Sequence, residues 1–132
     1  MSEARTAIVA SDGRYTYDQL DDASRRVAGC LLADNDDLRQ TRVAFLVAPS
    51  FAYAAVQRGI WRAGGVAVPL AVSHPPAELE YVIRDSGASV VVAGPGFEDV
   101  LAPLAKAVKA RFVRASDAIK AGVADELPHL PS

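Results

Sequence analysis

Residues 43–70, VAFLVAPSFAYAAVQRGIWRAGGVAVPL, contain two apolar runs that flank a stretch with helical spacing. The runs at 43–47 and 66–70 are continuous rather than alternating, which is typical of strands covered on both faces in a parallel sheet. Between them, Ser50 can cap a helix and Gly64 can end it in the left-handed conformation. A strand, a helix and a second strand of these lengths form a βαβ unit. The stretch therefore predicts a parallel α/β sheet.

The same pattern continues downstream. Pro75 and Pro76 suit the first turn of a helix, because the N–H groups that proline lacks would be unpaired there. We expect this helix over residues 77–86, with Gly87 at its end. Residues 89–93 are a third continuous apolar strand.

The next helical stripe contains Pro103, and proline inside a helix costs about 3 kcal/mol. We therefore expect a break between residues 99 and 102, with the main helix beginning at Ala102 or Pro103. Residues 111–115 are predicted as a last strand. From residue 116 to 132 no period is sustained, so we expect one partial α/β unit over residues 1–115 and an irregular tail over 116–132.

Upstream, the sequence predicts a hairpin that leads into a helix. Residues 5–10 and 14–17 are β-prone and flank an Asp-Gly pair, which is a strong hairpin signal. Thr16 and Gln19 stand at the spacing of a capping box, so a helix should begin at Tyr17. The expected fold class is α/β: a layered, mostly parallel sheet with helices on both faces, preceded by a short β-hairpin.

The composition excludes several classes of partner. Lys+Arg 14 against Asp+Glu 16 gives a formal net charge of -2, so we expect no nucleic-acid partner. Cys30 is the only cysteine and stands among apolar residues at helical spacing, which is typical of a buried thiol in a reducing compartment. Residues 1–5 begin no apolar leader, and the apolar runs are too short for a membrane span. We expect a cytoplasmic protein.

The loops after the three strands are the candidate ligand sites, because open α/β sheets bind ligands beyond the carboxyl ends of their strands. Gly94-Pro95-Gly96 lacks the third glycine of a dinucleotide fingerprint, and its proline removes a backbone donor, so we interpret it as a turn. Ser50 has no Gly-x-Ser-x-Gly surroundings, and a helix cap is its simplest role.

The two histidines do not indicate a metal site. Neither His74 nor His129 has a cysteine or second histidine at ligand spacing. His74 lies on a candidate ligand loop and could contact a phosphate or a carboxylate, but we favour a role in capping the helix that Pro75 begins. The sequence thus predicts no catalytic residue and no metal ligand.

Two segments resemble the first core motifs of adenylate-forming enzymes. They are Tyr15-Thr16-Tyr17-Asp18-Gln19-Leu20 and Trp61-Arg62-Ala63-Gly64-Gly65-Val66-Ala67-Val68-Pro69-Leu70. The longer stretch from Arg42 to Ser86 is most similar to acyl-CoA synthetases of the malonyl-CoA synthetase type. The resemblance extends to about Arg114 and corresponds to the N-terminal part of a much longer enzyme.

The resemblance implies an activity for the longer parent. Such enzymes use ATP and Mg²⁺ to convert a carboxylate into an acyl-adenylate and then transfer the acyl group to CoA. Their Pro-Lys-Gly phosphate loop, ribose-binding aspartate and C-terminal catalytic lysine have no counterpart here. The resemblance therefore implies a chain that is inactive alone and binds no cofactor tightly. By position, Ala71, Val72 and Ser73 correspond to a loop that helps to hold the CoA nucleotide.

Two other classes of protein share this pattern of strands and helices. A free-standing flavodoxin-like binding or interaction module would be a cooperatively unfolding monomer, whereas a fragment of an acyl-CoA synthetase should expose apolar surface and form a homodimer or aggregate. A receiver-like domain would need acidic residues at the strand ends, where the sequence has Ala48, Leu70 and Ala93. We favour the fragment, whose partner is the rest of the enzyme.

Overall fold

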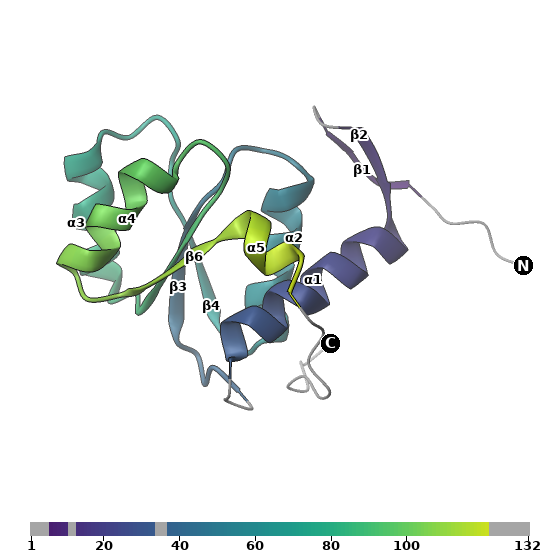
Figure 1. Cartoon of the computed structure of the whole chain (residues 1–132), viewed down its shortest axis with the longest axis horizontal. Coiled ribbons are helices and arrows are strands. Elements are labelled where there is room, and N and C mark those ends of the chain that lie inside the picture. The colour runs from purple at the N-terminus through teal and green to yellow at the C-terminus, as the bar shows by residue number, and fades with distance from the viewer. Residues whose placement is uncertain (1–5, 11–12, 34–36, 122–132) are drawn as a thin grey trace, which may run out of the picture.

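The computed structural model describes residues 6–10, 13–33 and 37–121 of the 132-residue chain. Within these ranges, strands and helices alternate after an N-terminal hairpin (Figure 1). The elements in chain order are β1 (Thr6–Ala10), β2 (Gly13–Thr16), α1 (Tyr17–Leu32), β3 (Arg42–Leu46), α2 (Phe51–Arg62), β4 (Val66–Pro69), α3 (Pro76–Ser86), β5 (Val90–Ala93), α4 (Glu98–Ala107), β6 (Arg111–Arg114) and α5 (Ala115–Ile119).

Strands β3 to β6 form one parallel sheet in the order β4-β3-β5-β6. The register pairs Phe45 with both Pro69 and Val92, so the strand ends lie nearly level. The predicted parallel sheet is thus confirmed. Pro69 is the last residue of an outer strand, which agrees with its inability to donate to a β ladder.

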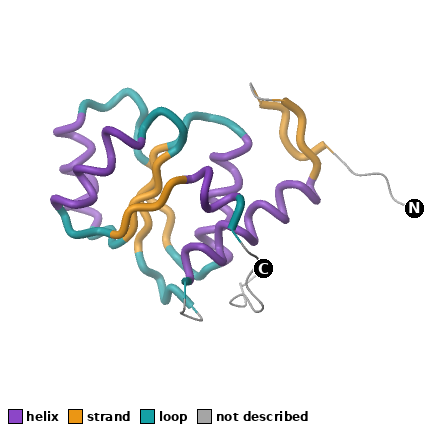
Figure 2. Tube along the Cα trace, in the orientation of Figure 1, coloured by secondary structure: helices purple, strands orange, loops and turns teal. Residues whose placement is uncertain are grey.

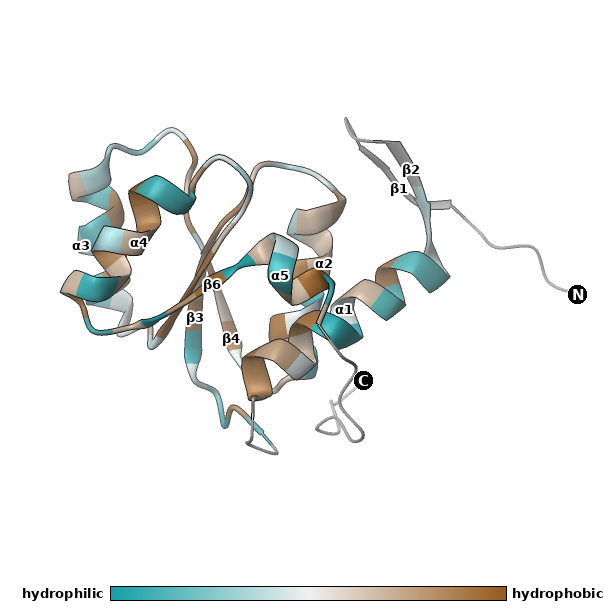
Figure 3. Cartoon of the chain, in the orientation of Figure 1, coloured by the Kyte–Doolittle hydropathy of each residue, from teal (hydrophilic) through white to brown (hydrophobic). Residues whose placement is uncertain are grey.

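Helices cover both faces of the sheet. Alternate residues of β3 point to opposite sides: Phe45 packs with α1, α2 and α5, whereas Leu46 packs with α3 and α4. Both side chains are almost fully buried. Figure 1 shows the two helix layers on either side of the strands, and Figure 3 shows that the strands are mainly apolar and the outer helix surfaces mainly polar. The predicted layered α/β architecture is confirmed.

The hairpin and the first helix form as predicted. β1 and β2 pair antiparallel, and the Ser11-Asp12 part of their turn lies outside the described residues. The Thr16 hydroxyl accepts a hydrogen bond from the Gln19 amide at 3.1 Å, and the Gln19 side chain accepts one from the Thr16 amide at 2.8 Å. This capping box begins α1 at Tyr17. The Tyr15 ring stacks on Phe51 with centroids 4.1 Å apart, which joins the hairpin to α2.

Three helices end in the same backbone motif. After α2 and α3, Gly64 and Gly87 adopt φ values of +86° and +71°, as the sequence predicts for left-handed closing residues. After α4, Lys109 has φ +60°, its amide donates to the Lys106 carbonyl, and the Ala110 amide donates to the Ala105 carbonyl. A lysine therefore occupies a position for which glycine is best suited.

The predicted break at Pro103 is wrong. Helix α4 runs without interruption from Glu98 to Ala107 and contains Pro103 in its second turn. The ring lies on the exposed side, where water can solvate the carbonyl that loses its donor, while Leu101 and Ala105 are fully buried on the opposite side. Burial of that apolar side outweighs the cost of one proline.

The C-terminal stretch is more ordered than the sequence indicates. Residues Ala115–Ile119 form α5, a helix that the sequence analysis did not predict at the start of the stretch 116–132. Ala115 and Ala118 are fully buried against α1 and α2. A helix of five residues is too short for its apolar positions to show a helical period in the sequence. Residues 122–132 lie outside the described part of the chain.

Long-range polar contacts hold α1 in place. The Asp21 carboxylate on α1 forms an ion pair with Arg62 of α2, in addition to a local pair with Arg25 of its own helix. At the other end of α1, the Arg111 guanidinium of β6 donates to the carbonyls of Cys30 and Leu31 at 2.8 and 3.1 Å. These two carbonyls belong to the last turn of α1, so Arg111 acts as a distant C-terminal cap.

The closing residue of α4 gives the first prediction. We expect Lys109→Gly to raise the free energy of unfolding by roughly 1 kcal/mol, because glycine adopts positive φ without the Cβ penalty. Gly87→Ala is the matched control and should lower stability by a similar amount, since an added Cβ would meet only the Arg42 guanidinium at 3.5 Å and the cost is conformational. Urea unfolding followed by circular dichroism measures both, and an unchanged midpoint for Lys109→Gly would contradict the argument.

The close contact between α1 and α2 gives the second prediction. A Cβ at Gly59 would overlap the Val27 side chain, so Gly59→Ala should destabilise the fold by about 1–3 kcal/mol, less the helix-propensity gain of roughly 1 kcal/mol. Adding Val27→Gly, which removes both the Cγ1 and the Cβ atom that the new methyl group would overlap, should recover part of that loss. The double-mutant cycle in urea should therefore show a favourable coupling, and strict additivity would show that the two positions are not in contact.

Candidate functional site

The three predicted ligand loops lie along one edge of the sheet. They follow β3, β4 and β5, whose parallel direction and level register bring their carboxyl ends together. Figure 2 shows the loops as teal segments at the same edge, each leading into the next helix. The fold therefore gathers residues 47–50, 70–75 and 94–97 along this edge.

The strand order shows where successive connections run to opposite sides of the sheet. From β3 the chain passes through α2 to β4 on one side, and from β5 it passes through α4 to β6 on the other. In open α/β sheets, ligands bind at such a switch point, here between the carboxyl ends of β3 and β5. The two loops approach closely, because a Cβ at Gly94 would lie 3.0 Å from the Val47 Cα. Sequence reasoning missed this position, since the strand order is not contained in residue periodicity.

Gly94-Pro95-Gly96 forms the predicted turn. The Phe97 amide donates to the Gly94 carbonyl at 3.0 Å, and Gly96 has φ +89°, as in a turn with proline at its second position. The Gly96 amide donates to the Glu98 side chain at 3.1 Å. An acidic side chain therefore occupies the donor that a phosphate would need, which agrees with the interpretation of this loop as structural.

Ser50 has the capping role that its surroundings indicate. Its hydroxyl donates to the Ala48 carbonyl at 2.8 Å and accepts from the Tyr53 amide at 3.3 Å. The first bond fixes the loop after β3, and the second caps α2. The Ser50 hydroxyl is thus committed to the local backbone in this structure.

Ala71, Val72 and Ser73 lie at the end of β4, one strand away from the switch point. All three are exposed, as are the residues that follow them up to Glu78. The His74 amide donates to the Ala71 carbonyl at 3.1 Å, so the segment closes as a short turn. The structure brings the three predicted CoA-loop residues together on an accessible surface, with backbone amides and the Ser73 hydroxyl as their polar groups.

His74 does not cap α3, so that prediction is wrong. The cap position is Pro75, which has φ -68°, and no side chain hydrogen bonds to the start of the helix. The His74 Nδ1 atom instead lies 3.8 Å from the Glu78 carboxylate, and both side chains are exposed. With Pro76 in the first turn, the helix begins with one donor fewer, which lessens the need for a capping side chain.

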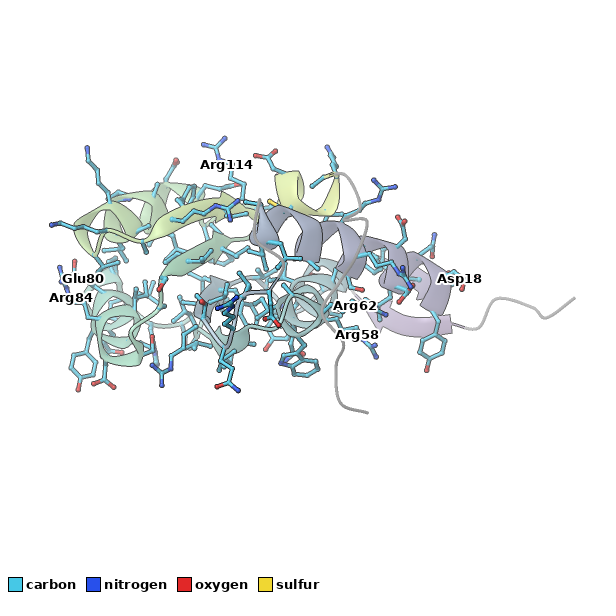
Figure 4. The ribbon with its side chains drawn as sticks, turned by 90° about the horizontal axis from the view of Figure 1, so that it is seen from below. Asp18, Arg58, Arg62, Glu80, Arg84 and Arg114 are labelled. Atoms are coloured by element: carbon cyan, nitrogen blue, oxygen red, sulfur yellow. The ribbon has the colours of Figure 1, made fainter. Side chains whose placement is uncertain are left out.

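Glu80 and Arg84 form one of the local ion pairs on the helix surfaces. Glu80 and Arg84 of α3 lie 3.5 Å apart, and Figure 4 shows them at one end of the molecule, well separated from Arg58 and Arg62 of α2. Across residues 6–10, 13–33 and 37–121, no three His, Cys, Asp or Glu residues are close enough to hold a metal ion. In the same ranges, none of the helices has both the length and the apolar character needed to cross a membrane.

Comparison with known proteins identifies the family of this chain. The family model described as AMP-binding enzyme matches residues 1–130. Human (Homo sapiens) malonate–CoA ligase ACSF3, mitochondrial, is 38% identical over 96% of this chain and 23% of its own length. The malonate–CoA ligase of Arabidopsis thaliana is 32% identical over 82% of this chain and 20% of its own length.

Solved structures agree with this assignment. Apo MatB from Rhodopseudomonas palustris superposes with a TM-score of 0.81 at 28% identity, covering 95% of this chain and 27% of MatB. ATP-bound MatB from the same organism gives a TM-score of 0.78 at 27% identity. The chain thus spans about a quarter of the proteins that it matches. On the evidence of its sequence and its parallel α/β sheet, this chain belongs to the AMP-binding enzyme family.

Proposed function

We propose that this chain is the N-terminal part of an ATP-dependent acyl-CoA ligase of the malonyl-CoA synthetase type. The parent would join a carboxylic acid to CoA through an acyl-adenylate, with ATP and Mg²⁺ as co-reactants. The main support is the 38% identity to a malonate–CoA ligase over nearly the whole chain, combined with coverage of only 23% of that relative. The cytoplasmic location remains a prediction, and the human relative is named as mitochondrial.

In this proposal the described α/β unit is a scaffold. The three lysines of the chain are Lys106, Lys109 and Lys120, and none stands in a Pro-Lys-Gly sequence. The groups that grip ATP in the family would therefore be supplied by the rest of the parent. The contribution of this chain would be the loop of Ala71, Val72 and Ser73, which would contact the nucleotide of CoA through its exposed backbone amides and the Ser73 hydroxyl.

Calorimetric titration of the 132-residue chain tests this division of roles. We expect no heat of binding with ATP and Mg²⁺, and weak binding of CoA. Val72→Asp should abolish the CoA signal, because a carboxylate in the loop repels the phosphates of CoA. The matched control is Val66→Asp, which makes the same change to another exposed valine at the opposite end of β4 and should leave CoA binding unaltered. Tight, Mg²⁺-dependent ATP binding would contradict the scaffold role.

The oligomeric state distinguishes the scaffold from the free-standing module. Trp61 and Val72 are each about half exposed, at 49% and 48%, and a fragment should carry such apolar surface where the rest of its parent covers it. We therefore expect the isolated chain to form dimers or larger species as its concentration rises. Light scattering over a dilution series measures this, and a strictly monomeric chain at millimolar concentration would favour the flavodoxin-like module.

A further inference from the structure

A histidine follows directly on the three residues of the predicted CoA loop. Residues 71–79 contain no lysine or arginine, and their ionisable side chains are His74 and Glu78. The His74 side chain is 44% exposed, at the carboxyl edge of the sheet where the ligand loops lie. An imidazole can carry positive charge and donate a hydrogen bond, which the side chains of Ala71 and Val72 cannot do. His74 is therefore the cationic donor of this segment.

The imidazole of His74 is not committed to a partner within the chain. Its Nδ1 atom lies 3.8 Å from the Glu78 carboxylate, which is longer than a hydrogen bond. Within the described part of the chain, the His74 side chain makes no hydrogen bond and no other ion pair. The ring can therefore donate to a ligand without breaking a bond that the fold requires.

The start of α3 has few backbone donors for an anion. Helix starts usually bind anions through unpaired amides. Here Pro75 and Pro76 have no N–H group, and the Glu78 and Leu79 amides both donate to the Pro75 carbonyl, at 3.0 and 3.1 Å. The His74 amide is likewise used, inside its own turn. A phosphate bound beside this helix therefore needs a side-chain donor from the preceding loop.

The neighbouring loops do not offer a competing cation. The loop after β5 leads into Glu98, which accepts the Gly96 amide, and into Asp99. The loop after β3, at residues 47–50, has no ionisable side chain. Across the three loops at the carboxyl edge, positive charge can thus arise only at His74, so an anion that reaches this edge is drawn to the end of β4.

We propose that His74 binds a phosphate of the CoA nucleotide through an N–H group of its imidazole, beside the loop of Ala71, Val72 and Ser73. The inference rests on the proposed function, which brings CoA to this loop. A charged donor makes hydrogen bonds roughly twice as strong as a neutral one, and the loop has no other. The Glu78 carboxylate repels the same phosphate and so limits the affinity.

Nuclear magnetic resonance of the His74 ring tests the contact directly. In the 132-residue chain, CoA should shift the carbon-bound proton signals of this imidazole until the site is saturated. His74→Ala identifies these signals, since His129 is the only other histidine. CoA has a phosphate monoester and a diphosphate, and 3′-dephospho-CoA distinguishes them: a lost shift would assign the monoester, and a retained shift the diphosphate. An unmoved His74 signal at millimolar CoA would overturn the proposal.

Charge variants provide a second readout by calorimetric titration with CoA. His74→Ala should weaken binding roughly tenfold, whereas His74→Lys retains a cationic donor and should restore most of the affinity. Glu78→Gln should strengthen binding about threefold, because it removes the carboxylate next to the bound phosphate. Equal affinities of the original chain and His74→Ala would overturn the proposal, and so would a His74→Lys variant that binds as weakly as His74→Ala.

Arg84→Gln on the same helix is the matched control. Arg84 pairs with Glu80 at the same spacing as His74 with Glu78, and both pairs are exposed. It lies roughly 12 Å along α3 from Pro76, so its loss should leave CoA binding unchanged. Neither Arg84→Gln nor His74→Ala should shift the thermal midpoint, because exposed ion pairs contribute little to stability. A large fall in the midpoint of His74→Ala would indicate a structural role and overturn the proposal.

The longer polypeptide from the same gene separates this inference from the proposed function. ATP-dependent acyl-CoA formation with equal KM values for CoA in the original protein and in His74→Ala would overturn the His74 contact alone. A CoA-dependent shift of the His74 signals without acyl-CoA formation would overturn the ligase assignment and leave the nucleotide contact standing.

Discussion

Burial of β3 on both of its faces is the constraint on which the rest of the structure depends. Phe45 needs the layer of α1, α2 and α5, and Leu46 needs the layer of α3 and α4, so neither layer can be removed without exposing an apolar side chain. Covering each fully buried side chain is worth roughly 1.5–3 kcal/mol. The parallel arrangement meets this constraint, because a crossover between parallel strands is long enough to hold a covering helix.

This arrangement explains why the edge with the ligand loops contains so little chemistry of its own. The parallel direction gathers three loops at the carboxyl edge, but two of them are stabilised by their own polar groups. Ser50 bonds to its neighbouring backbone, and Glu98 accepts the Gly96 amide. The loop of Ala71, Val72 and Ser73 remains accessible. Membership of the AMP-binding family gives this scaffold its context, and the reacting groups proposed for the parent lie outside the chain.

Much of the fold could be predicted from the sequence, because local patterns determine it. Apolar runs identify β3, β4 and β5, and the capping box at Thr16 identifies the start of α1. Helix α4 was predicted incorrectly because the cost of Pro103 is local, whereas the burial of Leu101 that outweighs it depends on tertiary contacts.

The site was less predictable than the fold, for physical reasons. His74 was assigned to a cap on the grounds of its position before Pro75, but a helix that starts with proline has less need of one. The switch point between β3 and β5 depends on the strand order, which cannot be read from the hydrophobic period of the sequence. The CoA role predicted for Ala71, Val72 and Ser73 comes from the family resemblance alone, since an alanine, a valine and a serine carry no distinctive chemistry.

The cap that Arg111 provides has a consequence for how the polypeptide matures. Its guanidinium reaches carbonyls that lie 80 and 81 positions earlier, and the Arg26 side chain donates to the Ala121 carbonyl, 95 positions later. During synthesis the first helix therefore emerges long before the groups that complete it. Such non-local pairing slows folding and prolongs the exposure of apolar surface. A ribosome-bound chain that ends before β6 would therefore expose apolar surface to which a chaperone can bind.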